Sequence, residues 1–359
     1  MAREICLPYN KPVYTYYTTI SFPFAICQPK DWLYSQCFNW YAAYHRNGGI
    51  SAYYGNKRIG ILTGDSRGGM PFLSYEYLKK SDLDSQLYKE IFYECLSKKK
   101  YIFLDINFQG YSHDINSEYT HNVLLHGIDE NNLYFLGYNM LSRDALSPYE
   151  SNKMELGVDN LFSDSAGNED VILLSQKDVK WSFCTDILKY QIRDYLDSSL
   201  TERYFKYYFS EGESEQTNTY FTYWHDKFFG QKMNGTFAYG LQVYEYFIDH
   251  IKEFWEKYEA DKSSAYPDAR IYKCMQEHKR MMADRWQYVQ RKGYAKADLS
   301  PYIESAIEVR DDADCIFNKL IKQFLKREFS YESVCDIIQK LEKIRKIEEN
   351  YLAELYDRL

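Results

Sequence analysis

The stretch Asp31–Gly49 reads DWLYSQCFNWYAAYHRNGG and places Cys37 directly before an aromatic-rich run. Aromatic residues and alanines recur at helical spacing after Cys37, and Gly48 and Gly49 end the run. This spacing predicts a helix that begins at Cys37. At the first turn of a helix, free backbone N–H groups and the positive end of the dipole favour a thiolate over a thiol. Cys37 is therefore a candidate nucleophile, although most free cysteines are simply small buried residues.

The composition indicates a globular protein. The chain has 359 residues, enough for two ordinary domains, and 45% of them are hydrophobic. A net charge of −8 argues against a general nucleic-acid binder. No apolar run is long enough to span a bilayer, and the eight cysteines contain no C-x-x-C pair of the kind found in zinc sites. We expect a reduced, cytoplasmic protein with no metal, no nucleic-acid partner and no membrane partner.

The first half of the chain alternates short apolar runs with turns, and we expect it to be a mixed α/β domain. A helix is predicted over 81–100, with Ser81 as its N-cap. Strands are predicted over 11–28, on either side of Gly55-Asn56, and over 101–108, 121–129, 133–139 and 171–175.

The second half has the apolar periodicity of helices. Helices are predicted over 187–196, 241–258, 271–293, from Ser300-Pro301 onward, and over 330–359. The change in character falls within 150–185, so the expected domains are residues 1–180 and 181–359.

His121 opens the second of the strands predicted near the middle of the chain, and it is the candidate partner of Cys37. An imidazole can remove the thiol proton and later return it to the leaving group. A third polar side chain usually fixes the tautomer of that imidazole, and the next strand ends at Asn139. His126 is the poorer base candidate, because Gly127 follows it at the far end of the strand. For either histidine the alternative is a satisfied polar residue of the strand.

These motifs resemble known enzymes in two ways. HNVLLHGIDENNLYFLGYN at 121–139 resembles the histidine strand of papain-like, bacteriocin-processing cysteine peptidases. QCFNWYAAYHRNGGI at 36–50, followed by RIGILTG, resembles the N-terminal domain of the butirosin-biosynthesis acyltransferase family. Members of that family often carry a helical second half with a Glu-His-Lys motif followed by an arginine, and this chain reads EHKRMMADRW at 277–286.

The chain departs from the peptidase pattern at two places. The peptidases usually have Asp-Pro at the end of the second strand, whereas this chain has Gly137-Tyr138-Asn139, so Asn139 is the provisional third residue. Papain-like sites also use an upstream glutamine as oxyanion donor. Gln28 and Gln36 both precede Cys37, and neither has the peptidase spacing.

A second arrangement competes for the nucleophile. Gly64-Asp65-Ser66-Arg67-Gly68 matches G-x-S-x-G, the nucleophile elbow of α/β-hydrolases. Gly69 and Pro71 follow, and they would break the helix that such an elbow requires. A glycine-rich turn between strands is the favoured interpretation of this run.

One face of the predicted helix over 271–293 combines polar and apolar residues. Its members recur at three and four residues along the helix: Met275, His278, Met282, Arg285 and Val289. This face is either a buried network or the wall of a substrate pocket, and His278, Met282 and Arg285 are the candidate substrate-binding residues. Lys279, Arg280, Arg291 and Lys292 flank it and are a candidate contact for an acidic partner protein or its phosphate.

The resemblance implies an α+β fold with a papain-like N-terminal catalytic domain, in which a nucleophile helix packs on an antiparallel sheet, and a helical C-terminal domain. It further implies transfer of an acyl group from a carrier-protein thioester to Cys37 and then to a small-molecule amine. The acyl or peptidyl carrier protein would bring phosphopantetheine only as its substrate arm, and no other cofactor is expected. A cysteine peptidase and a non-catalytic binding or resistance protein are the alternatives.

Overall fold

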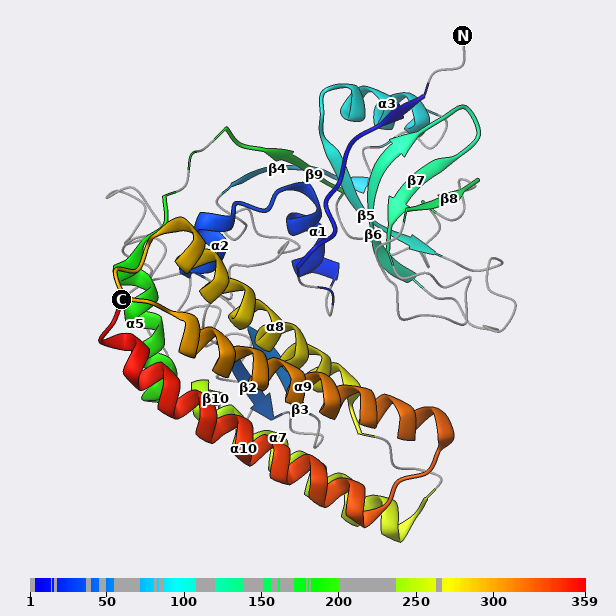
Figure 1. The fold of residues 1–359 in the computed structure, drawn as a ribbon. Coiled ribbons are helices and arrows are strands. Elements are labelled where there is room, and N and C mark those ends of the chain that lie inside the picture. The colour runs from blue at the N-terminus through cyan, green and yellow to red at the C-terminus, as the bar shows by residue number, and fades with distance from the viewer. Residues whose placement is uncertain are drawn as a thin grey trace. The chain divides into compact units, whose positions relative to one another are not determined.

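The computed structural model describes residues 4–13, 15, 18–36, 40–44, 50–54, 72–80, 83, 87–107, 120–137, 151–155, 161, 171–178, 180, 182–199, 237–262 and 267–359. The fold is α+β, with an antiparallel sheet and a helical C-terminal region (Figure 1). The chain divides into two compact units. Unit 1 comprises Met1–Pro29 and Lys57–Lys180, and unit 2 comprises Lys30–Asn56 and Trp181–Leu359. The segment Lys30–Asn56 therefore groups with the helical half, and the expected boundary at residue 180 stays a prediction.

Unit 1 is built on an antiparallel sheet. Its strands run in the order β4-β9-β5-β6-β7-β8, and β1 pairs with β6. The bounds are β1 Ile5–Cys6, β4 Leu73–Leu78, β5 Tyr101–Asn107, β6 Thr120–Ile128, β7 Leu133–Leu136, β8 Asn152–Met154 and β9 Val171–Gln176. The strands predicted over 101–108, 121–129, 133–139 and 171–175 are confirmed within the described residues. Asp129 accepts hydrogen bonds from the backbone N–H groups of Asn131 and Asn132 (2.8 and 2.7 Å), which forms the predicted turn between β6 and β7.

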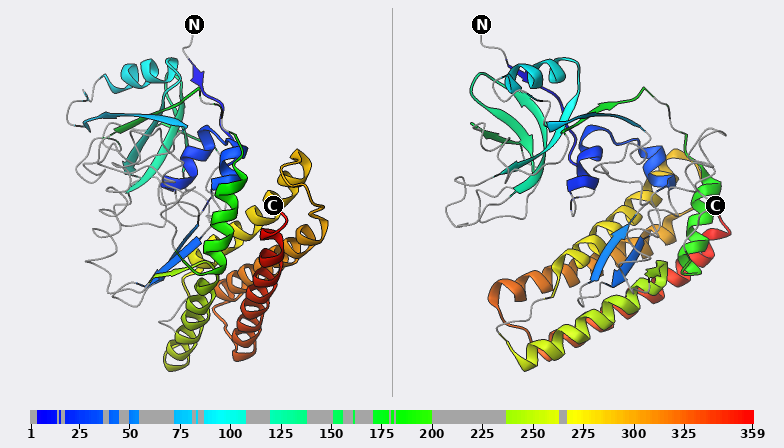
Figure 2. Two further views of the ribbon diagram at one scale, coloured as in Figure 1. Left: turned by 90° about the vertical axis from the view of Figure 1, so that its left-hand side faces the viewer. Right: turned by 180° about the vertical axis from the view of Figure 1, so that it is seen from behind.

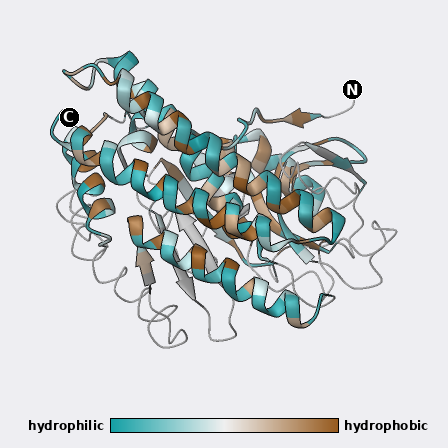
Figure 3. Ribbon diagram, turned by 60° about the horizontal axis from the view of Figure 1, so that its bottom comes forward, coloured by the Kyte–Doolittle hydropathy of each residue, from teal (hydrophilic) through white to brown (hydrophobic). Residues whose placement is uncertain are grey.

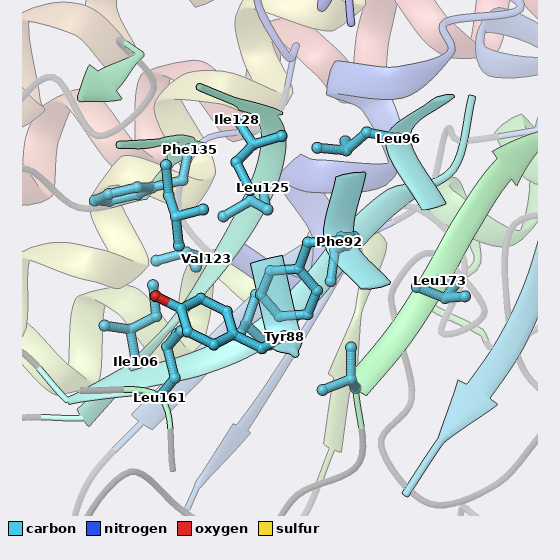
Figure 4. Packing of buried hydrophobic residues seen from close by; sticks show 14 residues of the cluster. Tyr88, Phe92, Leu96, Ile106, Val123, Leu125, Ile128, Phe135, Leu161 and Leu173 are labelled. Carbon is cyan, nitrogen blue, oxygen red and sulfur yellow. The ribbon is translucent and has the colours of Figure 1, made fainter. Parts of the chain in front are cut away.

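One face of this sheet buries the core of unit 1. Helix α3 (Tyr88–Ser97) packs on β5 and β6, and Tyr88, Phe92 and Leu96 are its buried residues. Figure 4 shows these side chains among Ile106, Val123 and Leu125 of the two strands. The alternation of β5 and β6 thus puts their apolar residues against an amphipathic helix.

Two predictions for unit 1 are wrong in detail. Residues 11–28 were expected to be extended, but α1 covers Thr18–Ile26 and contains Pro23. The helix buries aromatic side chains: Phe22 and Phe24 are fully buried, and the ring centroids of Phe22 and Phe103 lie 6.0 Å apart. Helix α3 begins at Tyr88, not near Ser81, and Leu87 at its N-cap makes no side-chain capping bond.

Unit 2 is mainly helical. Its helices are α2 (Lys30–Gln36), α5 (Thr185–Leu196), η5 (Gly240–Gln242), α7 (Val243–Ala260), α8 (Ala269–Lys292), α9 (Ser300–Lys326) and α10 (Tyr331–Tyr356). Helix α9 packs against α8 and α10, and α10 also packs against α7. Figure 2 shows these long helices side by side. In Figure 3 hydrophobic and hydrophilic positions alternate around them, as expected for helices with one buried face.

The helix predicted to start at Cys37 is wrong for its described residues. Residues Trp40–Tyr44 form strand β2, which pairs antiparallel with β3 (Ile50–Tyr54) and with β10 (Phe237–Tyr239). Aromatic side chains suit a pleated, half-buried surface, and pairing on both sides satisfies the backbone groups of β2. The partner β10 comes from far along the chain, so the local helical spacing could not reveal it.

The helix ends largely follow their sequence signals. Gly293 ends α8 with a φ of 68°, the left-handed conformation that glycine adopts without steric cost. Ser330 caps α10 by accepting a hydrogen bond from the N–H of Ser333 (3.2 Å). At α9, however, Ser300 lies inside the helix, and Asp298 accepts the bond from its N–H (3.0 Å).

Candidate functional site

The predicted nucleophile and its predicted third partner, Cys37 and Asn139, lie outside the described residues, as does Ser66. One argument for Cys37 nevertheless changes. Helix α2 ends at Gln36, so Cys37 follows the C-terminal end of a helix in the chain. The dipole of α2 is negative at that end and does not favour a thiolate.

His121 lies near the start of β6, as predicted, and pairs with Ile106 of β5. Its side chain is partly buried, and its Nδ1 lies 3.1 Å from the carbonyl oxygen of Asn122. In the next residue pair of the β5–β6 ladder, the side-chain amide of Asn122 donates a hydrogen bond to the carboxylate of Asp105. Burial is the main cause that raises the pKa of this carboxyl group. His121 thus has a defined place on a buried strand of unit 1.

Unit 2 contains a cluster of buried polar side chains that we call the Lys279 cluster: Lys279, Glu348, Tyr195 and Tyr244. The Nζ of Lys279 lies 3.0 Å from Glu348 and donates to the hydroxyl of Tyr195 at 2.9 Å. Both tyrosine hydroxyls donate to Oε2 of Glu348 at 2.5 Å. All four side chains are fully buried, and the ammonium, the two hydroxyls and Oε2 of Glu348 are hydrogen-bonded within the cluster.

Aromatic rings enclose the ammonium of Lys279. Its Nζ lies 4.0 Å from the ring centroid of Trp40, 5.0 Å from that of Tyr244 and 5.4 Å from that of Tyr195. Such cation–π contacts gain strength when they are desolvated. Burial lowers the pKa of Lys279 to about 8, against the opposing attraction of Glu348. Burial and the nearby Glu348 also raise the pKa values of Tyr195 and Tyr244 well above the ordinary value.

The predicted face of α8 is real and fully buried. His278, Met282 and Arg285 each have 0% of their surface exposed. The ring of His278 stacks on Trp40, with centroids 5.0 Å apart and planes 4° from parallel. Arg285 donates from Nε to the carbonyl oxygen of Tyr34 (2.8 Å). A substrate would therefore reach these residues only if the side chains that cover them moved.

The segments on either side of residues 37–39 are held firmly within unit 2. On the N-terminal side, the carbonyl oxygen of Ser35 accepts a hydrogen bond from Nε2 of Gln191 (2.6 Å). The carbonyl oxygen of the preceding residue, Tyr34, accepts the hydrogen bond from Arg285 described above. On the C-terminal side, the indole N–H of Trp40 donates to the carbonyl oxygen of Gly240 (2.9 Å). Helices α5 and α8 and the turn η5 thus fix both flanks of Cys37.

The predicted basic contact surface is wrong for Lys279, which is buried and paired with Glu348, 69 residues further along the chain. Helical charges normally face solvent, but here a partner of opposite charge lies across the helix interface. Arg280 donates two hydrogen bonds to the carboxylate of Asp314 (2.9 and 3.1 Å). Arg291 and Lys292 remain exposed at the end of α8.

The two glutamines proposed as oxyanion donors lie in different units. Gln28, in unit 1, donates from Nε2 to the carbonyl oxygen of Lys11 (2.6 Å). Gln36 is the last residue of α2, in unit 2. Their assignment as oxyanion donors stays a prediction.

Sequence reasoning missed the Lys279 cluster, although a signal was present. Lys279 lies midway between Tyr272 and Trp286, seven residues from each, and both are fully buried. Glu348 lies in the same way between Leu341 and Leu355 on α10. A lysine in the apolar row of one helix and a glutamate in the apolar row of another together predict a buried ion pair between the two helices.

No family model and no curated protein matches the chain. Across the described ranges, no three histidine, cysteine or acidic side chains gather in a way that would hold a metal ion. In the same part of the chain, every helix is too short or too polar to cross a bilayer.

Proposed function

We propose that the protein is a cysteine-dependent acyltransferase that forms an amide from a carrier-protein thioester and an amine, through an acyl-enzyme on Cys37. One observation carries the proposal beyond the sequence pattern. Described residues of the two stretches that resemble the acyltransferase family, 36–50 and 277–286, meet in unit 2. Trp40 from the first stretch stacks on His278 and covers Lys279 from the second. Stretches that act together are expected to pack together.

His121 lies on β6, and β6 pairs with β7. Asn139 follows β7 in the chain and lies outside the described residues. A neighbouring strand is where a papain-like enzyme carries the group that orients its histidine. Asn139 is therefore our proposal for that group, and Gln28 and Gln36 remain the candidates for the oxyanion donor.

The proposed chemistry uses two exchanges at sulfur. The Cys37 thiolate attacks the thioester carbonyl, the phosphopantetheine thiolate of the carrier protein leaves, and an acyl-enzyme forms. An amine then attacks the acyl-enzyme, Cys37 leaves as thiolate, and His121 receives and returns the proton. The first exchange is nearly thermoneutral and the amide product is stable, so exclusion of water would favour transfer over hydrolysis.

In this proposal, the buried residues of unit 2 position the flanks of Cys37. Arg285 and Met282 act through the Tyr34 carbonyl on α2, and His278 and Lys279 act through Trp40 on β2. Arg291 and Lys292 remain candidate contacts for an acidic carrier protein. The natural context would be specialised metabolism in the cytoplasm. The protease-like amide-forming enzyme of polythioamide biosynthesis is an example of this enzyme type.

The test is intact-mass analysis of the protein after incubation with acyl-carrier thioesters. We expect one acyl adduct on Cys37, its loss in Cys37→Ala, and its loss in His121→Ala with an unchanged melting temperature. Addition of amines should discharge the adduct as an amide. His126→Ala is the matched control for His121, since both residues lie on β6.

Two outcomes would point elsewhere. If Cys37→Ala still forms the adduct and Ser66→Ala does not, a serine hydrolase is the correct interpretation. If the adduct never forms but peptides are cleaved in a Cys37-dependent way, the protein is a cysteine peptidase.

A further inference from the structure

His126 occupies an irregular position in β6 of unit 1. In the β6–β7 ladder Leu125 pairs with Phe135 and Gly127 pairs with Tyr134, so His126 is the extra residue of a β-bulge. A bulge re-aims the side chain that it carries, and bulges are over-represented next to active sites. The backbone at this point is also fixed from the other side, because the carbonyl oxygen of His126 accepts the N–H of Leu7 (2.7 Å).

The imidazole of His126 is buried, with 4% of its surface exposed. Its ring lies 4.9 Å from that of Tyr9 and 6.5 Å from that of Tyr134, measured between centroids. Burial lowers its pKa below the ordinary value, so the neutral form dominates at neutral pH. The backbone of Leu7 opposes this lowering of the pKa but does not outweigh burial.

The other nitrogen of the ring faces a serine. Nε2 of His126 lies 2.9 Å from Oγ of Ser151, which directly precedes β8. Ser151 is exposed, and β8 is the last strand of the sheet order. A buried histidine thus contacts the hydroxyl of an exposed serine. In serine hydrolases Nε2 of the histidine makes the same contact with the nucleophile.

We propose that Ser151 and His126 form a second nucleophilic site, which accepts acyl groups from small activated esters. Oγ of Ser151 attacks the ester carbonyl while its proton passes to Nε2 of His126. A Ser151–acyl bond forms, the bond to the ester oxygen breaks, and the alcohol leaves with the proton from Nε2. Water, activated by the same nitrogen, then releases the acid and restores the serine. This site is independent of Cys37 and goes beyond the proposed acyl transfer.

A fluorophosphonate tests the nucleophile directly, because attack by Oγ forms a P–O bond and expels fluoride. The probe is added to full-length Cys37→Ala protein, so that the thiol does not contribute, and the adduct is located by mass spectrometry. We expect labelling of Ser151 at least about 100-fold faster than that of Ser97, as general-base assistance alone predicts. Ser97 is the internal control: it is also exposed in unit 1, but it donates to the carbonyl oxygen of Glu94 (2.7 Å).

Two variants assign the base. His126→Gln should lower the labelling rate to that of Ser97. His126→Ala should do the same and recover when imidazole is added, a rescue that a purely structural histidine would not show. Labelling of Ser151 and Ser97 at equal rates in the Cys37→Ala protein would overturn the proposal, and this comparison needs no histidine variant to fold. Unchanged labelling in a folded His126→Gln protein would also overturn it.

Discussion

At the residue scale, the protonation of Lys279 depends on its burial. Its folded-state pKa of about 8 lies below the ordinary 10.5, so between these pH values the unfolded chain binds more protons than the folded one. The free energy of unfolding should therefore rise with pH across this window, by about 3 kcal/mol in total. Urea unfolding between pH 7.5 and 9.5 should show this rise in the native protein and its loss in Lys279→Met. The raised pKa values of Tyr195 and Tyr244 oppose it only above about pH 10.

The control for that measurement is Lys322→Met, which removes an exposed lysine from α9. Its pH dependence should match that of the native protein. Equal slopes in the native protein and Lys279→Met would mean that the ammonium of Lys279 keeps its ordinary pKa. A further variant, Lys279→Met with Glu348→Met, should recover much of any stability that the single change loses, because apolar side chains can replace a buried ion pair.

At the element scale, the pairing of β1 with β6 requires glycine at position 127. A Cβ there would lie 2.7 Å from Sγ of Cys6 and 2.8 Å from the carbonyl oxygen of Ile5, and a backbone oxygen cannot swing aside. Gly127→Ala should therefore separate β1 from β6 and lower the free energy of unfolding by about 1–3 kcal/mol. Gly137→Ala is the matched control, since its nearest neighbour, Cγ1 of Val123, would be 3.1 Å away and belongs to a side chain. A smaller loss for Gly127→Ala than for Gly137→Ala would contradict the required close approach.

At the scale of the whole molecule, the two units should respond separately to damage in their cores. Trp40 comes early in the chain but belongs to unit 2, where it contacts Tyr244, Phe247 and His278. Trp40→Ala should lower amide protection in α7 and α8 and leave β5 and β6 unchanged, as measured by hydrogen exchange with mass spectrometry. Phe103→Ala, in the core of unit 1, is the reciprocal control. Loss of protection in β5 and β6 on Trp40→Ala, equal to that in α8, would show that the units do not unfold independently.

Local patterns in the sequence determined most elements that bury one continuous face. The strands β5, β6, β7 and β9 and the helices α5, α7, α8, α9 and α10 follow from period and turn signals alone, because each carries its own apolar stripe. The same patterns identified His121 at the start of β6 and the buried face of α8. Whether Cys37, His121 and Asn139 act together stays a prediction.

Tertiary structure alone decided the remaining features. WYAAY at 40–44 has helical spacing but forms a strand, because β3 and the distant β10 satisfy its backbone. Lys279 was expected to be a surface charge but is buried, because Glu348 and the hydroxyl of Tyr195 lie within hydrogen-bonding distance of its ammonium. His126 lies at a bulge of β6 and meets Ser151, which is 25 residues further along the chain. In each case the deciding partner lies far away in the chain, so local spacing alone does not identify it.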